Sequence, residues 1–136
     1  MDLKNAIALS AFGMKAQGSR LRVIAENLAN ANSTAQSPGD LPYRRKVVLF
    51  ENALNKELGL DTVRVKKVDV DRGDFQRRFD PGHPSADADG YVLLPNVNTL
   101  IESMDMREAQ RSYEANLGAI DASRQMIQRT LDLLRG

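Results

Sequence analysis

The chain has 136 residues, which is enough for one modest hydrophobic core. It carries 19 Lys and Arg against 18 Asp and Glu, and aromatic residues make up only 5% of it, so nucleic-acid binding is disfavoured. It contains no cysteine, which excludes disulfides, thiolate zinc sites and cysteine nucleophiles.

The N-terminal part is predicted to form one helix of about 28 residues. Its apolar positions follow a strict four-three spacing, which places them on one face of a helix. The helical pattern runs straight through residues 6–14, the one segment that could imitate a signal peptide, so no cleaved signal peptide is expected. We call this stripe the N-terminal seam, and its main members are Leu3, Ile7, Met14, Leu21, Ile24 and Leu28.

A polar connector and a β-rich segment follow. Residues 30–42 are rich in Asn, Ser, Gly and Pro, which ends the first helix. Residues 43–50 and 62–70 are β-branched and partly alternating, as in strands, and Asp89-Gly90 predicts a tight turn into a short strand. Between them, the spacing of Phe50, Leu54 and Leu58 indicates one short helix that ends at Gly59.

Residues 99–134 predict a second long helix, because they contain no Pro and only one Gly. The four-three spacing returns here as the C-terminal seam, whose main members are Met106, Tyr113, Leu117, Ile120, Ile127, Leu131 and Leu134. The expected fold is therefore mainly α with a small β-rich insert. Two long terminal helices pack as an antiparallel, coiled-coil-like pair, and the insert lies on the outside.

The expected division places residues 1–34 and 99–136 in a helical core, and residues 35–98 in the connector and insert. Two such helices bury little more than one seam each. Some seam positions are small or polar, which favours close or selective helix contacts over a purely apolar core: Ser10, Gln17, Asn116 and Ser123. A hairpin within one chain and an assembly between copies both remain open at this point.

Few residues could carry chemistry. His83 is the only histidine, and it would need a carboxylate such as Asp87 to act as a general base; a rigid turn with local hydrogen bonds is the alternative. Residues 87–90 resemble the start of a calcium loop, but Asn96 stands where the bidentate Glu belongs. A weak cation site at Asp87 and Asp89, or a metal-assisted hydrolase using both with His83, is a remaining alternative. No catalytic, cofactor-binding or metal-binding residue is assigned.

A compact basic triplet, Arg44, Arg45 and Lys46, opens the first predicted strand. It is either the exposed face of that strand or a charged contact with a neighbouring subunit. The triplet stands alone, without a glycine-rich phosphate loop or a serine nucleophile motif anywhere in the sequence.

Several motifs together resemble the flagellar rod and hook protein family. The N-terminal signature is SAFGMKAQ at residues 10–17 followed by LRVIAENLANANST at residues 21–34. The later motifs, which within the family point to a subunit of the proximal rod, are PYRRKVVLF at 42–50, DPGHP at 80–84, DADGYV at 87–92, PNVN at 95–98 and RSYEAN at 111–116. The resemblance spans nearly the whole chain in the expected order.

The resemblance implies a non-enzymatic structural subunit, without cofactor, that assembles helically around the export channel and transmits motor torque. It implies a periplasmic rod location, reached through the flagellar type III export apparatus without cleavage of a signal peptide. The terminal helices would form the inner rod domain and the insert the outer domain. The implied partners are other copies, other rod proteins and the rod base with its membrane ring, with no nucleic acid and no small-molecule substrate. A coiled-coil dimeric adaptor or binding module is the alternative.

Overall fold

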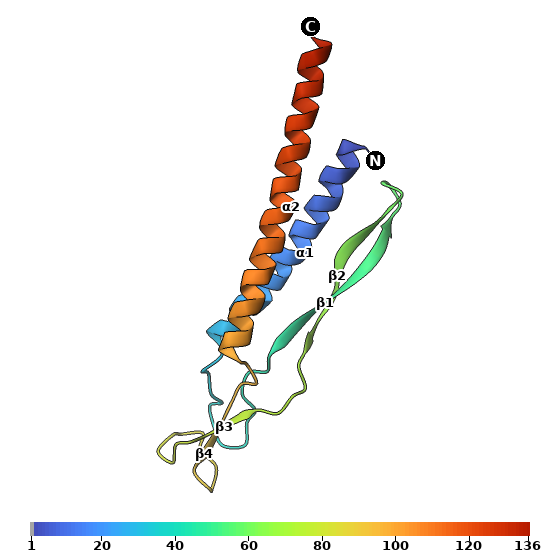
Figure 1. The fold of residues 1–136 in the computed structure, drawn as a ribbon. Coiled ribbons are helices and arrows are strands. Elements are labelled where there is room, and N and C mark those ends of the chain that lie inside the picture. The colour runs from blue at the N-terminus through green and yellow to red at the C-terminus, as the bar shows by residue number, and fades with distance from the viewer. Residues whose placement is uncertain (1) are drawn as a thin grey trace. The chain divides into compact units, whose positions relative to one another are not determined.

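The computed structural model describes residues 2–136 of the chain. Long helices form both ends and four strands lie between them in the described residues, which confirms a mainly α fold with a small β-rich insert (Figure 1). Within these residues no helix combines the length and apolarity that a membrane crossing requires. The elements are α1 Leu3–Ala29, β1 Lys46–Asn55, β2 Leu60–Val70, β3 Gln76–Phe79, β4 Tyr91–Leu94 and α2 Thr99–Leu134.

Side-chain caps fix the start of each helix. Asp2 accepts a hydrogen bond from the backbone N–H of Lys4 (3.2 Å), and Asn98 accepts from the N–H groups of Leu100 and Ile101 (3.1 and 3.3 Å). These caps satisfy amides that have no partner inside the helix. The predicted bounds of α2 agree with the observed Thr99–Leu134, and α1 has 27 residues against the expected 28 or so.

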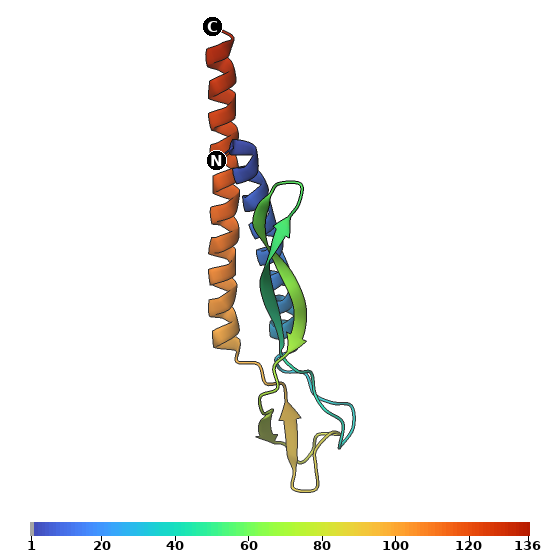
Figure 2. The same ribbon diagram turned by 90° about the vertical axis from the view of Figure 1, so that its right-hand side faces the viewer.

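The chain divides into two compact units. The first unit holds residues up to Leu21, with Val48–Lys67 and Arg107–Gly136. In it α1 and α2 run antiparallel: a Cβ on Gly13 would lie 2.8 Å from Asn116 Nδ2, and Arg20 pairs with Glu108 at 3.5 Å. The β1–β2 hairpin runs alongside α1 (Figures 1 and 2), and Ala16 and Ala109 are almost fully buried in this unit.

The segment predicted as a short helix around Phe50, Leu54 and Leu58 is instead a strand followed by a turn, so that prediction is wrong. β1 continues to Asn55, and the Gly59 N–H donates to the Asn55 carbonyl (2.8 Å) at the tip of the hairpin. Gly59 does adopt the left-handed conformation expected of it, with φ of 65°. The signal at Gly59 was therefore correct, but it closes a β-hairpin loop rather than a helix.

The second unit comprises Arg22–Val47 and Val68–Met106. It contains a small antiparallel sheet in which β3 pairs with β4, with Phe79 opposite Tyr91 and Gln76 opposite Leu94. The predicted turn before β4 is confirmed, because Gly90 has φ of 83°. Strand β3 was not predicted from the sequence. The buried residues of this unit include both apolar and polar side chains: Val23, Ile24, Asn27, Ala31, Val92, Pro95, Val97 and Glu102.

Candidate assembly interface

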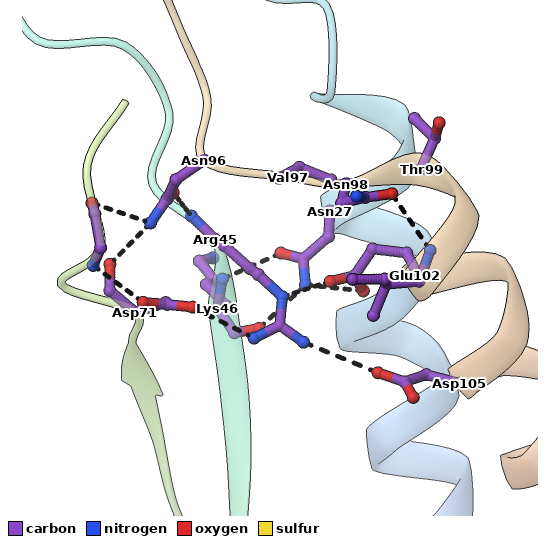
Figure 3. Close-up of polar contacts among 12 residues, drawn as sticks. Asn27, Arg45, Lys46, Asp71, Asn96, Val97, Asn98, Thr99, Glu102 and Asp105 are labelled. Carbon is purple, nitrogen blue, oxygen red and sulfur yellow. Dashed lines mark hydrogen bonds and ion pairs between the residues drawn. The ribbon is translucent and has the colours of Figure 1, made fainter. Parts of the chain in front are cut away.

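A buried polar network occupies the centre of the second unit (Figure 3). Asn27 on α1 and Glu102 on α2 are each 1% exposed, and Asn27 Nδ2 donates to Glu102 Oε2 at 3.2 Å. Glu102 Oε1 accepts a hydrogen bond from Arg45 Nε, and the two charged side chains form an ion pair. One buried carboxylate therefore joins both helices to the segment that leads into β1.

Asn27 uses the full hydrogen-bonding capacity of its amide. Its Oδ1 accepts from the Tyr43 hydroxyl (2.8 Å) and from the Lys46 N–H (2.9 Å). Its Nδ2 donates to the Lys46 carbonyl (2.8 Å) as well as to Glu102. The amide thus pairs with both backbone groups of Lys46 as a neighbouring strand would, which positions the start of β1 against α1.

Arg45 is the cationic centre of the network. Its guanidinium also approaches Asp71 (3.4 Å) and Asp105 (3.6 Å), so one cation meets three carboxylates. Burial by itself would lower the pKa of Arg45, but the hydrogen bond and the negative charge of Glu102, with help from Asp71, outweigh burial and raise the pKa above its ordinary value. The side chain of Arg45 remains charged and held in place at every physiological pH.

The other two basic residues of the triplet also have partners within the chain. Arg44 Nη1 donates to the carbonyls of Asp71 (3.0 Å) and Gly73 (2.8 Å), and its guanidinium lies 4.2 Å from the centre of the Phe75 ring. Lys46 Nζ pairs with Glu26 at 3.0 Å, and this hydrogen bond is the main reason why the pKa of Lys46 is raised. A contact with another subunit stays a prediction for the triplet.

The sequence did not identify Asn27, Glu102 or the acidic partners of Arg45 as structural centres. One signal was present: Glu102 lies four residues before Met106, the first residue of the C-terminal seam, and therefore on the same face of α2. A carboxylate at such a position needs a buried cation, and the nearest basic residue in space is more than 50 residues away in sequence. Tertiary structure alone supplies that pairing.

The seam residues are only partly covered within the described chain. Ile24 is buried and most others are half-buried, but the last part of the C-terminal seam is open. Leu117, Leu131 and Leu134 are 42%, 44% and 79% exposed. The structure therefore covers part of each seam and leaves apolar side chains uncovered at Leu117 and toward the end of α2.

The residues considered for catalysis form a closed turn. His83 Nδ1 accepts a hydrogen bond from the Ser85 N–H (3.0 Å), so the ring proton is on Nε2, which faces Thr34 Oγ1 at 3.3 Å. Asp87 Oδ1 accepts from the N–H groups of Asp89 and Tyr91, at 2.9 Å each. Among residues 2–136 no group of three or more His, Asp or Glu side chains could hold a metal ion. The geometry is that of a hydrogen-bonded turn.

Comparison with known proteins identifies the family. The chain is 50% identical to the flagellar basal-body rod protein FlgC of Agrobacterium fabrum over 133 residues, covering 98% of this chain and 96% of that protein. The chain belongs to the FlgC family of flagellar basal-body rod proteins. FlgC of Aquifex aeolicus is 41% identical (97% of each chain) and FlgC of Bacillus subtilis 36% identical (98% and 99%). Residues 88–133 also match the family described as flagellar basal body rod FlgEFG protein C-terminal.

These matches confirm the resemblance that the motifs indicated. Members of the FlgC family are structural rod proteins of the flagellar basal body, and this chain is a structural rod subunit in the same sense. The dimeric adaptor alternative is not favoured. The network of Asn27, Arg45 and Glu102 therefore belongs to a structural protein. Its hydrogen bonds and ion pair hold α1, α2 and the segment before β1 together.

Proposed function

We propose that this chain is a non-enzymatic subunit of the proximal rod, assembled helically around the export channel, where it transmits motor torque. Residues 1–34 and 99–136 form an inner helical domain, and residues 35–98 form an outer domain. Membership in the FlgC family and the proximal-rod motifs support this assignment. The closed, hydrogen-bonded turn around His83 supports a role without catalysis.

The observation that carries the proposal is the uncovered apolar surface of α2. Leu100, Met104 and Leu134 are 70%, 61% and 79% exposed. Large apolar side chains that a single chain leaves exposed on a helix are typical of a surface that another protein covers. Neighbouring subunits would complete the burial that the single chain leaves unfinished.

The same surface explains how the assembly becomes permanent and stiff. A single helix contact between subunits is weak, but a subunit held on several sides gains each further contact as an intramolecular event. Close-packed helix contacts have low compressibility and pass force on with little deformation. Torque would then travel through the helical inner domain rather than through flexible linkers.

The expected location is the periplasmic rod, reached by the flagellar type III export apparatus without cleavage of a signal peptide. The expected neighbours are other copies of the chain, other rod proteins and the rod base in the membrane ring. Purified basal bodies provide the test: the intact chain, with its own N-terminus, should be found in them. A monodisperse dimer that never associates with basal bodies would favour the coiled-coil adaptor.

A charge swap tests whether the basic triplet contacts another subunit. Lys46→Glu should weaken rod assembly, and more strongly at low salt, because exposed ion pairs are screened by salt. The matched control combines Lys46→Glu with Glu26→Lys, which restores the ion pair within the chain. Assembly that stays impaired in the swapped protein indicates a contact with a neighbour. Full rescue by the swap would assign Lys46 to the intrachain pair alone.

A further inference from the structure

The small sheet of the second unit has an open edge along β3. The Asp80 N–H donates to the Gly90 carbonyl (2.9 Å), and hydrogen-bonded pairs alternate with non-bonded pairs along an antiparallel ladder. The backbone N–H and C=O groups of Arg77 and Phe79 therefore point away from β4. Within residues 2–136 these groups have no hydrogen-bond partner, and all four residues of β3 are exposed. The edge can thus accept a further strand.

The edge of β4 is covered at the corresponding point. There the Tyr91 N–H donates to Asp87 Oδ1 and the Tyr91 carbonyl accepts from the Asp87 N–H, at 2.9 Å each. The turn before β4 thus satisfies the outward backbone groups of Tyr91, which lies opposite Phe79 in the sheet. No segment of the described chain does the same for Phe79. Unpaired edge groups of this kind are a template for pairing with another chain.

The side chains at this edge are of the types that are enriched in protein interfaces. The Arg77 guanidinium lies 4.3 Å from the centre of the Tyr91 ring, and the centres of the Phe79 and Tyr91 rings are 5.3 Å apart, so the three share one face of the sheet. Phe79 is 63% exposed. Arg77 and Tyr91 also line a pocket of about 230 Å³, together with Leu41 and Leu93. Aromatic residues and Arg are common at the centres of interfaces, so this face favours contact with a protein.

Charge indicates which chain fits the edge. The side chains of Arg77 and Arg78 are 54% and 49% exposed, and their acidic partners Asp87 and Asp80 are 3.8 Å away in each case, which is too far for a hydrogen bond. Both guanidinium groups can therefore still bind a carboxylate. A second copy of β3 would bring arginines close to arginines, which is unfavourable across paired strands. An extended segment with acidic side chains is favoured instead.

We propose that a neighbouring rod protein adds an extended, acidic segment to β3 as a third strand of this sheet. The inference rests on the proposed function, since it names the kind of partner that this edge takes in the rod. The backbone groups of Arg77 and Phe79 supply main-chain hydrogen bonds, as in other cases where a peptide extends an open sheet. Carboxylates of the added strand bind Arg77 and Arg78, and charge-assisted hydrogen bonds of this kind are among the stronger ones.

Amide hydrogen exchange tests the edge in the wild-type chain. In the purified chain the amides of Arg77 and Phe79 should exchange fast, because they have no partner. In isolated basal bodies both should slow by about a hundredfold or more. The amide of Arg78, which points toward β4, is the internal control and should be protected in both samples. Fast exchange of Arg77 and Phe79 in basal bodies would overturn the proposal.

A proline substitution tests the main-chain contact itself. Arg77→Pro removes an outward N–H and leaves the ladder to β4 intact, since proline is tolerated where the N–H of an edge strand faces solvent. Arg77→Thr is the matched control, because it removes the same side chain but keeps the N–H. Basal bodies should contain about fivefold less of Arg77→Pro than of Arg77→Thr, the loss expected for one hydrogen bond. Equal amounts of the two variants would contradict the proposal, and if Arg77→Pro does not fold, the exchange measurement decides.

Photochemical cross-linking identifies the occupant. Phe79 is replaced with the photoreactive amino acid benzoylphenylalanine, and isolated basal bodies are irradiated. An adduct with an acidic segment of another rod protein is expected. An adduct between two copies of this chain would overturn the proposed partner. Absence of the wild-type chain from basal bodies would overturn the proposed function and this inference together, whereas its presence with unprotected amides at β3 would overturn this inference alone.

Discussion

At the scale of single residues, Glu102 is a buried carboxylate whose two oxygens both have partners. It is 1% exposed and accepts from Asn27 on one helix and from Arg45 beside β1. Burying a carboxylate is unfavourable unless it is both paired and hydrogen-bonded, and both conditions are met here. Removing its charge leaves Arg45 facing only the two more distant carboxylates of Asp71 and Asp105.

Glu102→Gln should therefore lower the free energy of unfolding by about 3 kcal/mol, since the amide adds a donor where donors already converge and removes the charge that Arg45 requires. Urea denaturation followed by circular dichroism measures it. Glu108→Gln is the matched control. Glu108 lies on α2, as Glu102 does, and pairs with Arg20 of α1, but it is 72% exposed, so its loss should change stability by less than about 0.5 kcal/mol. Equal losses for the two variants would contradict the importance of the buried network.

Tyr43 should make stability sensitive to alkaline pH. Burial, with the charges of Glu26 and Glu102, raises the pKa of its hydroxyl above the ordinary 10.0, although Lys46 acts in the opposite direction. The folded state thus favours the neutral phenol. The contribution of Tyr43 to the free energy of unfolding is therefore complete below the pKa of the unfolded chain, and it is lost as pH rises through the higher pKa of the folded state. The raised pKa of Lys46 adds a loss of the same sign.

Urea midpoints at about pH 8 and about pH 11 test this expectation. Tyr43→Phe should start from a lower stability, because the hydrogen bond to Asn27 is missing, and should lose less between the two pH values than the wild type. Tyr91→Phe, at an exposed tyrosine, should lose as much as the wild type. If all three proteins lose the same stability, Tyr43 does not contribute to the alkaline transition.

At the scale of elements, the two helices were predictable because their signals are local and long. The four-three spacing, the Asn98 cap and the absence of Pro over residues 99–134 all favour the same structure. The hairpin was less predictable. Phe50, Leu54 and Leu58 fit a helical spacing, but β1 gains a strand partner in β2 that the spacing of three residues cannot reveal. Strand β3 is four exposed residues, and only its pairing with β4 defines it.

Two glycines in α1 should respond differently to alanine. A Cβ at Gly18 would meet open space, so Gly18→Ala should stabilise the chain by about 1 kcal/mol through helix propensity. A Cβ at Gly13 would lie 2.8 Å from Asn116 Nδ2, which donates to the Ser112 carbonyl. Gly13→Ala must displace the Asn116 side chain, so it should lose most or all of the stabilisation expected for Gly18→Ala.

A double-mutant cycle checks the cause. In an Asn116→Ala background the obstacle is removed, and Gly13→Ala should recover a gain close to that of Gly18→Ala in urea denaturation. The Gly18→Ala gain itself should be the same in both backgrounds. If Gly13→Ala stabilises the wild-type chain fully, α1 and α2 do not approach as closely at Gly13 as the structure has them.

At the scale of the whole molecule, the exposed apolar side chains of α2 predict that stability depends on association. The urea midpoint of the purified chain should rise with protein concentration over about a hundredfold range, because assembly binds the folded state alone. Combining Leu131→Ala with Leu134→Ala should flatten this dependence with little change at the lowest concentration, since both side chains are exposed in the single chain. Midpoints that do not change with concentration in the wild type would contradict the prediction.

The sequence by itself determined the two helices, the stripes along them, the turn at Gly90 and the family, because spacing and motifs are properties of neighbouring residues. Tertiary structure alone decided that residues of the basic triplet pair within the chain with Asp71, Glu26 and Glu102, because these partners are 20 to 57 residues distant along the chain. It also decided which part of each seam is covered. A stripe on a helix predicts that a partner exists, but only the register of α1 on α2 shows where that partner ends.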